Sequence, residues 1–352
     1  MRTKEEQEAI NKACKYHPET KEELQELVSD PKINLGLIDT SKITDMSDLF
    51  FCSKREDFSG IEKWDVANVT DMHSMFAYCY EFNQPLNDWD VSSVKNMEGM
   101  FYRCKAFNQP LDLWNTSKVT DMSCMFTRCE KFNQDLNTWD VSCVENMSSM
   151  FFGCSNFNQD LNDWNVSNVT DMYGMFAGCK NFNQDISSWD VANVTDMGYM
   201  FEECTNFNQP LNNWDVSNVT SMRAMFANCV DFNQDISSWD VANVTDMSGM
   251  FAICTSFNQP LDNWDVSSVY EMSDMFFGCE EFNQPLNDWN VREDCDIYRM
   301  FTNTSQTYEN VKDSFSEEQL LDSGSEKIIE ALNNKKEQIE VQEQKVTKGR
   351  GR

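Results

Sequence analysis

The sequence predicts an α/β repeat protein, a solenoid whose 25-residue coils each hold one short extended segment and one short helix. Tryptophan and cysteine carry this prediction, because ten tryptophans and nine of the cysteines recur at intervals of 25 residues. A period of about 20 to 50 residues is typical of solenoids, propellers and arrays, and a coil this short cannot hold a four-stranded propeller blade. The recurring residues are Trp64, Trp89, Trp114, Trp139, Trp164, Trp189, Trp214, Trp239, Trp264 and Trp289, with Cys79, Cys104, Cys129, Cys154, Cys179, Cys204, Cys229, Cys254 and Cys279.

The short helix is expected near the start of each repeat. In the unit from Asp71 to Lys95, Met72, Met75, Phe76 and Cys79 are spaced as on one face of a helix. Thr70 or Asp71 is suited to the N-cap, since its side chain can accept a hydrogen bond from the first turn. The pattern therefore predicts a helix of one to two turns.

The extended segment is expected from Phe82 to Leu86. Pro85 lies within it and cannot donate a ladder hydrogen bond, so part of the segment is unpaired. The chain then turns near Trp89 toward the next helix. One such coil cannot bury its apolar residues alone, so each must stack on its neighbours.

The repeat resembles a known family. Its consensus, M-x-x-M-F-x-x-C-x-x-F-N-Q-x-L-x-x-W-D-V-S-x-V-T-D, is similar to the tandem repeat of BspA-like leucine-rich-repeat surface proteins, a bacterial surface protein repeat of unknown function. The resemblance covers roughly residues 34 to 301, including the lead-in Ile38–Met46. It implies a right-handed leucine-rich-repeat-like solenoid that is displayed on a cell surface and serves attachment or recognition.

The two ends of the chain depart from the repeat. Thr3 with Glu6 and Thr20 with Glu23 have the spacing of capping boxes, so residues 1–33 are expected to form a helical N-terminal cap. The tandem solenoid is expected to span 34–301. Residues 302–352 are expected to form a polar C-terminal extension, with a loose helix near 325–346.

Charge excludes several classes of function. The chain has 352 residues, with 28 Lys or Arg and 59 Asp or Glu, so its formal charge is −31. Such a protein is a poor general binder of nucleic acid, which is held by basic side chains. No apolar stretch reaches the roughly 20 residues that span a bilayer. The first residues lack the apolar core of a signal peptide, so the sequence alone predicts a cytoplasmic protein, whereas the family resemblance implies the cell surface.

Catalysis is not expected. His17 and His73 are the two histidines, they lie on different segments, and the common nucleotide, hydrolase and metalloprotease motifs are absent. Acidic pairs recur in every coil, whereas an active site is a single constellation. We therefore expect neither enzyme activity nor a cofactor.

The repeated apolar columns are interpreted as structure. Trp89 to Trp264 and Cys79 to Cys254 are expected to form core stacks, with the thiols reduced. Side chains of stacked rungs run parallel, which suits neither a disulfide nor a tetrahedral metal site. The Asn-Val-Thr triplets beginning at Asn68 and its equivalents match glycosylation acceptors but are read as structural.

The surface leaves alternatives open. The asparagine row of Asn83 and its equivalents, through Asn283, is either an amide ladder that satisfies the backbone or a binding row. Recognition has two candidate surfaces. One is the repeated polar face, represented by Gln84, Asp88 and Asp90. The other is the variable helix side, which has His73, Ser74, Ala77 and Tyr78 in one coil and Arg223, Ala224, Ala227 and Asn228 in another.

These observations predict a non-catalytic recognition or adhesion solenoid. It would act as a monomer and bind a protein or glycan partner that the sequence does not identify. The alternative is a structural array that binds divalent cations through repeated aspartate rows.

Overall fold

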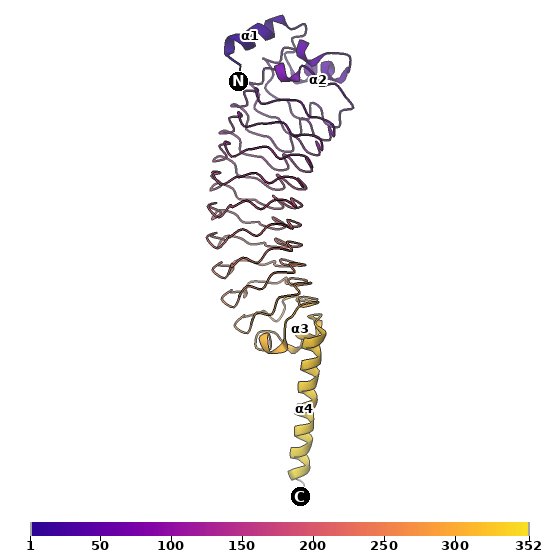
Figure 1. Cartoon of the computed structure of the whole chain (residues 1–352), viewed down its shortest axis with the longest axis vertical. Coiled ribbons are helices and arrows are strands. Elements are labelled where there is room, and N and C mark those ends of the chain that lie inside the picture. The colour runs from indigo at the N-terminus through magenta and orange to yellow at the C-terminus, as the bar shows by residue number, and fades with distance from the viewer. Residues whose placement is uncertain (1, 351–352) are drawn as a thin grey trace.

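The computed structural model describes residues 2–350, and the side chains of residues 2–344. The chain forms an elongated stack of coils that is closed at both ends by helices (Figure 1). The described residues include no helix that is both long enough and apolar enough to cross a membrane. The helices are α1 (Lys4–Ala13), α2 (Lys21–Ser29), α3 (Glu317–Asp322), α4 (Glu326–Arg350) and the short 3₁₀ helices η1 (Leu35–Leu37), η2 (Ile61–Lys63) and η3 (Tyr308–Asn310).

Successive coils are joined by one parallel bridge each. Eleven coils are linked in this way, and each contributes a single bridging residue, so the described part of the chain has no β-strand. The bridging residues are Asp45, Asp71, Asn96, Asp121, Asn146, Asp171, Asp196, Ser221, Asp246, Glu271 and Asp296.

The prediction of a short helix in each coil is wrong, because the segment forms a series of consecutive turns instead. From Met72 to Tyr78, every second backbone N–H donates to a carbonyl of the next coil, at 2.7 to 3.0 Å. The N–H groups of Met75, Ala77 and Cys79 instead donate to the carbonyl three residues earlier. An α-helix would direct these bonds to the residue four positions earlier. The backbone is thus shared between local turns and the neighbouring coil.

Left-handed backbone conformations explain why helical spacing does not produce a helix. Ser74 and Tyr78 have φ angles of 52° and 66°, which end any right-handed helix after a few residues. The equivalents of these two residues in the other coils also have positive φ, and several are glycine, such as Gly153 and Gly178. Glycine adopts this conformation at no steric cost.

The predicted extended segment, Phe82–Leu86, is non-helical but forms no sheet. The equivalent segments of adjacent coils are connected through side chains. For example, the backbone N–H of Asn108 donates to Oδ1 of Asn83 in the preceding coil, at 2.9 Å. The amide side chain therefore replaces the backbone carbonyl that a strand would use, and the extended part of the α/β prediction is corrected to a non-helical spine.

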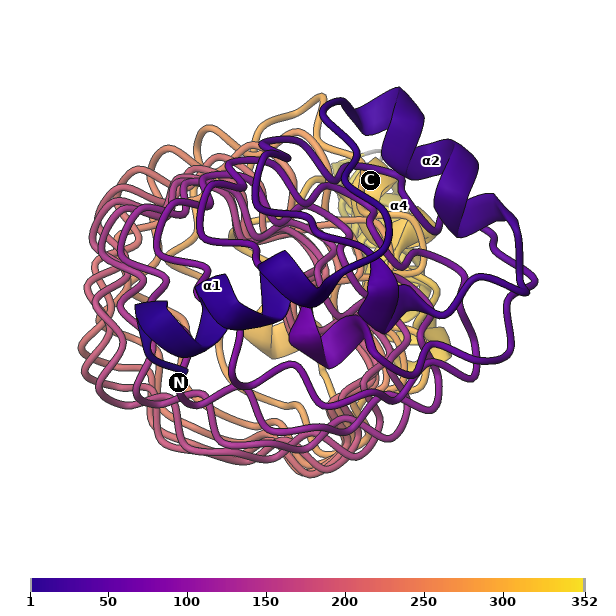
Figure 2. The same ribbon diagram turned by 90° about the horizontal axis from the view of Figure 1, so that it is seen from above.

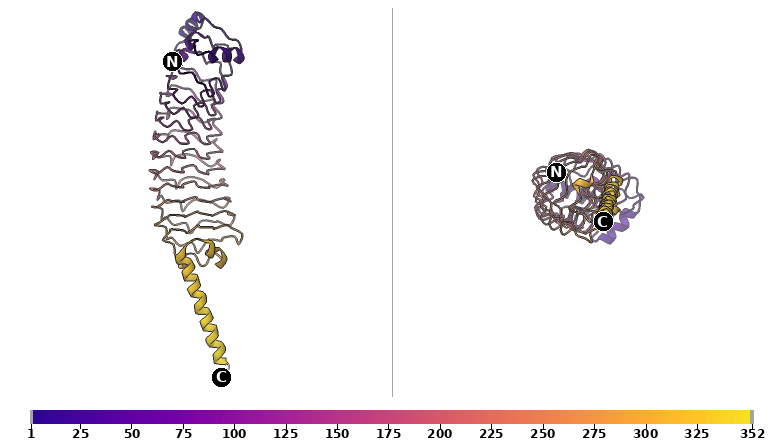
Figure 3. Two further views of the ribbon diagram at one scale, coloured as in Figure 1. Left: turned by 90° about the vertical axis from the view of Figure 1, so that its right-hand side faces the viewer. Right: turned by 90° about the horizontal axis from the view of Figure 1, so that it is seen from below.

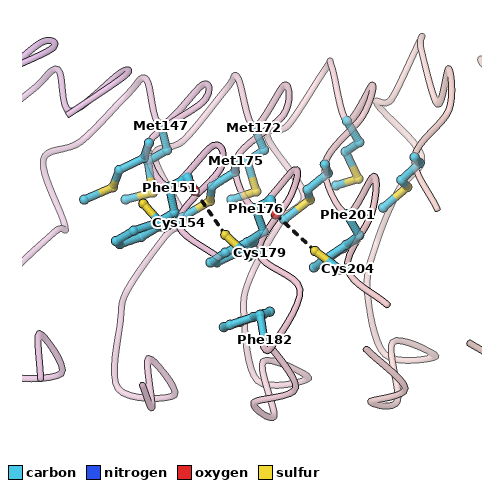
Figure 4. Close-up of a cluster of buried hydrophobic side chains, with 14 of the residues drawn as sticks. Met147, Phe151, Cys154, Met172, Met175, Phe176, Cys179, Phe182, Phe201 and Cys204 are labelled. Carbon is cyan, nitrogen blue, oxygen red and sulfur yellow. Dashed lines mark hydrogen bonds between the residues drawn. The ribbon is translucent and has the colours of Figure 1, made fainter. Parts of the chain in front are cut away.

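The core fills the interior of the stack. Figure 4 shows Met172, Met175, Phe176 and Cys179 directed inward, with the equivalent side chains of the adjacent coils beside them. Ring centroids of Phe151 and Phe176 lie 5.7 Å apart with nearly parallel planes. Each coil thus covers the aromatic rings of the next.

The N-terminal end is covered by α1 and α2 (Figure 2). The predicted capping box of Thr3 and Glu6 is present in full at the start of α1. The second prediction is half correct, because Thr20 accepts from the N–H of Glu23 while the Glu23 carboxylate accepts from Glu19.

The two cap helices are held differently. α2 buries Leu24 and Val28, whereas α1 has no buried residue and is attached by hydrogen bonds such as Asn11 Nδ2 to Asp65 Oδ2, at 2.7 Å. The buried guanidinium of Arg55 donates to the carbonyls of Val28 and Asp30, at the C-terminal end of α2. These bonds satisfy carbonyls that a helix leaves without partners.

The C-terminal end of the stack is also covered by the residues that follow the last coil, and α4 lies where the sequence predicts a loose helix. The N–H groups of Arg299 and Phe301 donate to Asp322 and Ser323, so the end of α3 occupies the place of a further coil. Ile328 and Leu332 anchor the first turns of α4 in the core. The rest of α4 projects away from the stack (Figures 1 and 3).

Candidate functional site

The repeated aspartates form turns within their own coils. Asp71 Oδ1 accepts the N–H of His73 at 2.9 Å, and Asp140 Oδ1 accepts the N–H of Ser142 at 3.0 Å. The Ser142 hydroxyl and N–H hold the pKa of Asp140 below its ordinary value. At Asp171, burial raises the pKa of the carboxyl, and the nearby Asp196 adds to that shift. One oxygen of each of these carboxylates is therefore committed to the backbone.

The predicted polar face is represented by Gln84, Asp88 and Asp90. Its residues have different roles in the structure. Asp90 accepts the N–H of Ser92 at 3.1 Å. Equivalents of Gln84 take part in the amide ladder, since Gln134 Nε2 donates to the asparagine of the preceding coil at 2.9 Å. Asp88 lines a cavity of about 630 Å³ between α1 and the first coils, which carries charges of both signs.

The asparagine row is an amide ladder. Asn158 Oδ1 accepts from the N–H of Asn183 at 2.9 Å and from Gln184 Nε2 at 2.9 Å. The bond from the backbone N–H to the Oδ1 of the preceding coil recurs between successive asparagines from Asn83 to Asn283. Of the two interpretations left open by the sequence, the structure supports the ladder.

The Asn-Val-Thr triplets also connect coils. Asn193 Nδ2 donates to the carbonyl of Ser167 at 2.7 Å, and Thr195 Oγ1 donates to that of Thr170 at 3.2 Å. Glycosylation of Asn193 would have to displace the first of these bonds. The triplets thus have a structural role at every coil where this pattern occurs.

The predicted core residues lie inside the stack. Trp89 to Trp264 are at most 3% exposed, and each indole Nε1 donates to a carbonyl of the preceding coil, as Trp164 does to Leu136 at 2.9 Å. Cys79 to Cys254 are buried and free, and the Cys104 thiol donates to the carbonyl of Phe76 at 3.1 Å. Burial raises the pKa of Cys79 to about 12, and it also raises the pKa of Cys104 well above its ordinary value.

The aspartate rows and the two histidines are the side chains that the cation-binding alternative would use. In the part of the chain that the structure describes, no group of three or more His, Cys, Asp or Glu side chains is arranged to hold a metal ion. His17 contacts Asp39 and His73 lies 4.0 Å from Glu98, on separate segments.

One surface differs from coil to coil. We call it the turn face: the variable positions of the turn segment, which are residues 73, 74, 77, 78 and 80 and their equivalents in the other coils. Positions 73, 74, 77 and 78 are the variable helix side predicted from the sequence, with turns in place of the helix, and position 80 lies beside them in the structure. The exposure of its members varies widely, since Ala77 is 1% exposed whereas Tyr80 is 45% exposed.

Aromatic and arginine side chains gather on the turn face near its N-terminal end. Phe51 packs edge-on against Tyr78, at 5.5 Å between ring centroids, and Tyr78 contacts both Tyr80 and Tyr102. The Arg103 guanidinium lies over the rings of Tyr78 and Tyr102, at 5.4 and 5.6 Å.

The cluster continues into the next two coils. Arg128 lies 5.8 Å from the ring centroid of Phe152. Beyond it lies a hollow of about 340 Å³ lined by the small Gly153 and Gly178 and by charged side chains of both signs, namely Arg128, Lys180, Glu130, Glu202 and Glu203. We call Phe51, Tyr78, Tyr80, Tyr102, Arg103, Arg128 and Phe152 the tyrosine–arginine cluster.

A second group lies farther along the turn face. Tyr173 and Tyr199 have ring centroids 5.3 Å apart, and Arg223 Nε donates to the Tyr199 hydroxyl at 2.7 Å. A hollow of about 450 Å³ beside Arg223 is lined by Asp246, Glu271 and Asp274. The turn face therefore carries aromatic and arginine side chains in both groups, and carboxylates line the hollow beside each of them.

A comparison of the chain with models of known protein families found one matching family. The model described as "Mycoplasma protein of unknown function, DUF285" matches residues 22–139, 120–229 and 200–315, which together span most of the chain. The chain belongs to this family. A search of the curated proteins found no match.

Sequence reasoning identified the surface of this DUF285 protein but not its cluster. It named Tyr78 and Arg223 as members of a variable face, and it did not bring together Tyr102, Arg103 and Arg128. Aligning the repeats at 25 residues would have placed Arg103 and Arg128 one coil apart at the same position as Tyr78. The contacts of Arg103 with two tyrosines could not be predicted, because they depend on the turns of the backbone and the sequence predicted a helix there.

Proposed function

We propose that this DUF285 protein is a non-catalytic recognition solenoid that binds a protein or glycan partner through its turn face. One observation carries the proposal: the repeated polar rows connect coils or close turns, whereas the turn face changes from coil to coil. Recognition of one partner requires a surface that is not the same in every repeat. Tyrosine and arginine, which gather there, are also the residues most often enriched at energetic centres of protein interfaces.

We further propose the finer assignment, a right-handed, leucine-rich-repeat-like member of the BspA-like surface proteins. The 25-residue consensus supports it, while the single bridges between coils are a reduced form of the sheet that such a solenoid would have. Display at a cell surface is part of the same proposal. Protease treatment of intact cells tests it, since a displayed protein is degraded and an internal one is protected.

A selection experiment tests the recognition proposal. A peptide-display library and a glycan array would be probed with the full chain and with two turn-face variants, Tyr80→Ser with Arg128→Ser, and Tyr173→Ser with Arg223→Ser. The matched control, Leu113→Ser with Lys118→Ser, removes one apolar and one basic exposed residue away from the turn face.

We expect selected ligands to bind at least one turn-face variant tenfold more weakly and to bind the control like the parent. Ligands that tolerate both turn-face variants and are lost on the control would place recognition elsewhere and refute the proposal.

A further inference from the structure

Two arginines of the tyrosine–arginine cluster lie at the same position of successive coils. The N–H of Arg103 donates to Thr127 and that of Arg128 to Phe152, so each joins its coil to the next in equivalent fashion. Coils stack at roughly 4.8 Å, the spacing of neighbouring extended chains. The two side chains therefore start from adjacent rungs, where like charges are destabilising.

Neither guanidinium has an ion-pair partner among the described side chains, although Lys105 in the same region pairs with Glu130 at 2.8 Å. This is unexpected in a chain with 59 acidic and 28 basic residues. Among the described side chains, the surface thus holds an arginine pair without a direct ion pair to a carboxylate, although Glu130, Glu202 and Glu203 line the hollow beside Arg128.

The surrounding rings hold this pair in place. Arg103 is half-buried between Tyr78 and Tyr102, and the Tyr102 hydroxyl raises the pKa of its guanidinium further. Arg128 is exposed above Phe152. Arginine presents a planar fork that matches a carboxylate with two hydrogen bonds, and stacking on rings pre-organises that fork.

We propose that the Arg103–Arg128 pair docks an acidic segment of a partner protein, with carboxylate side chains bound to the two guanidinium groups. The inference rests on the proposed recognition function and names its partner. The partner is expected to be acidic because its carboxylates would complement the positive charges of the two guanidinium groups. The partner is expected to be a polypeptide because of the length of the cluster. Its residues, from Phe51 to Phe152, lie in five successive coils, so the cluster is about 20 Å long at the spacing of the stack. An extended peptide of about six residues covers that distance, whereas a single small anion would contact only the arginines.

Fluorescence anisotropy with a labelled hexaglutamate peptide tests the proposal on the full chain. The net charge of −31 repels this probe, so non-specific attraction does not produce binding. A labelled hexaserine peptide is the neutral probe, and inorganic phosphate and a sialylated oligosaccharide are the competitors.

The test variant is Arg103→Gln with Arg128→Gln. The matched control is Lys95→Gln with Lys118→Gln, which removes two exposed charges away from the turn face and changes the net charge equally. Because Arg103 is half-buried, the single variant Arg128→Gln is measured as well, and thermal melts verify that each protein is folded.

We expect saturable binding of hexaglutamate and none of hexaserine. Affinity should fall at least tenfold in the double variant, at least threefold in Arg128→Gln, and less than twofold in the control. The proposal is overturned by absence of binding to the parent, by equal loss in the control, or by tighter binding of phosphate or the sialylated sugar than of the peptide. The proposed recognition function would still hold after such a result if the turn-face variants bound the selected ligands more weakly than the parent.

Discussion

The backbone N–H of Asn108 donates to the side-chain Oδ1 of Asn83 in the preceding coil, at 2.9 Å. This single contact explains why a strand-like segment forms no strand. The asparagine side chain supplies the acceptor that a β-ladder would take from a backbone carbonyl, so the coils are joined without a second row of backbone bridges. It also explains why asparagine recurs at this position in nine successive repeats.

Backbone strain at Ile253 gives the first prediction. Its φ of 63° lies in the left-handed region, where a β-branched residue is a genuine outlier, and its side chain is 39% exposed. Ile253→Gly removes the steric cost while its N–H can still bond to Phe277. We expect the free energy of unfolding to rise by about 1 kcal/mol in urea melts.

The matched control is Ala252→Gly, one residue earlier, where φ is not positive. Glycine there should lower stability by about 0.5 to 1 kcal/mol. If both glycine variants are destabilised alike, left-handed strain is not present at Ile253.

Thiol accessibility gives the second prediction. Cys52 and Cys143 are exposed, whereas the ladder from Cys79 to Cys279 is buried. A maleimide should label the two exposed thiols rapidly in native protein and the ladder only after denaturation. Rapid native labelling of the ladder would mean that the interior and exterior of the coils are reversed.

The same burial extends the second prediction to a pH dependence of stability. Burial raises the pKa of Cys79 from 9.0 to about 12, so the folded state keeps the thiol neutral while the unfolded chain ionises above pH 9. The stabilisation is fully present below pH 9 and is lost as pH rises toward 12. Each such thiol should contribute up to about 1.4 kcal/mol per pH unit in that window. Urea melts at pH 8 and pH 10 measure it, and Cys154→Ser, which does not titrate, should reduce the difference.

The third prediction concerns the tryptophan column. Trp164→Ala removes a buried ring that stacks on Trp189 at 6.3 Å. It also removes one of the two donors to the Leu136 carbonyl, which keeps the N–H of Trp139. We expect a loss of about 3 to 5 kcal/mol. Trp64→Ala, next to the N-terminal cap, should cost less because damage at an end only shortens the array.

Calcium titration gives the fourth prediction. Aspartates such as Asp71 and Asp140 already accept backbone N–H groups, so bound calcium would have to replace or share these acceptors. We expect no saturable rise in melting temperature, with magnesium as the control cation. A large, saturable rise with calcium alone would restore the cation-array hypothesis.

Sequence reasoning could establish the period, the inward columns and the N-terminal helices, because these depend on residue spacing and local capping. It could not distinguish a helix from successive turns. The spacing of Met72, Met75, Phe76 and Cys79 places the same side chains inward in both, and the positive φ of Ser74 carries no signal in serine itself.

The C-terminal cap and the tyrosine–arginine cluster were missed for a different physical reason. Both depend on contacts between residues that the repeat consensus does not contain. Phe315 and Leu320 are buried against the last coil although their segment reads as polar. The contact of Arg103 with Tyr78 is fixed by coil stacking, which the sequence indicates only when the repeats are aligned.

The central claim is that the repeated polar rows hold the coils together and leave recognition to the turn face. The most direct measurement is urea unfolding of Asn158→Leu beside Asn158→Asp. Leucine removes the oxygen that accepts from Asn183 and Gln184, whereas aspartate keeps an acceptor there. We expect Asn158→Leu to lose about 1 to 3 kcal/mol and Asn158→Asp to stay within about 1 kcal/mol of the parent. Equal stability of Asn158→Leu and the parent would contradict the claim and make the asparagine row available for binding.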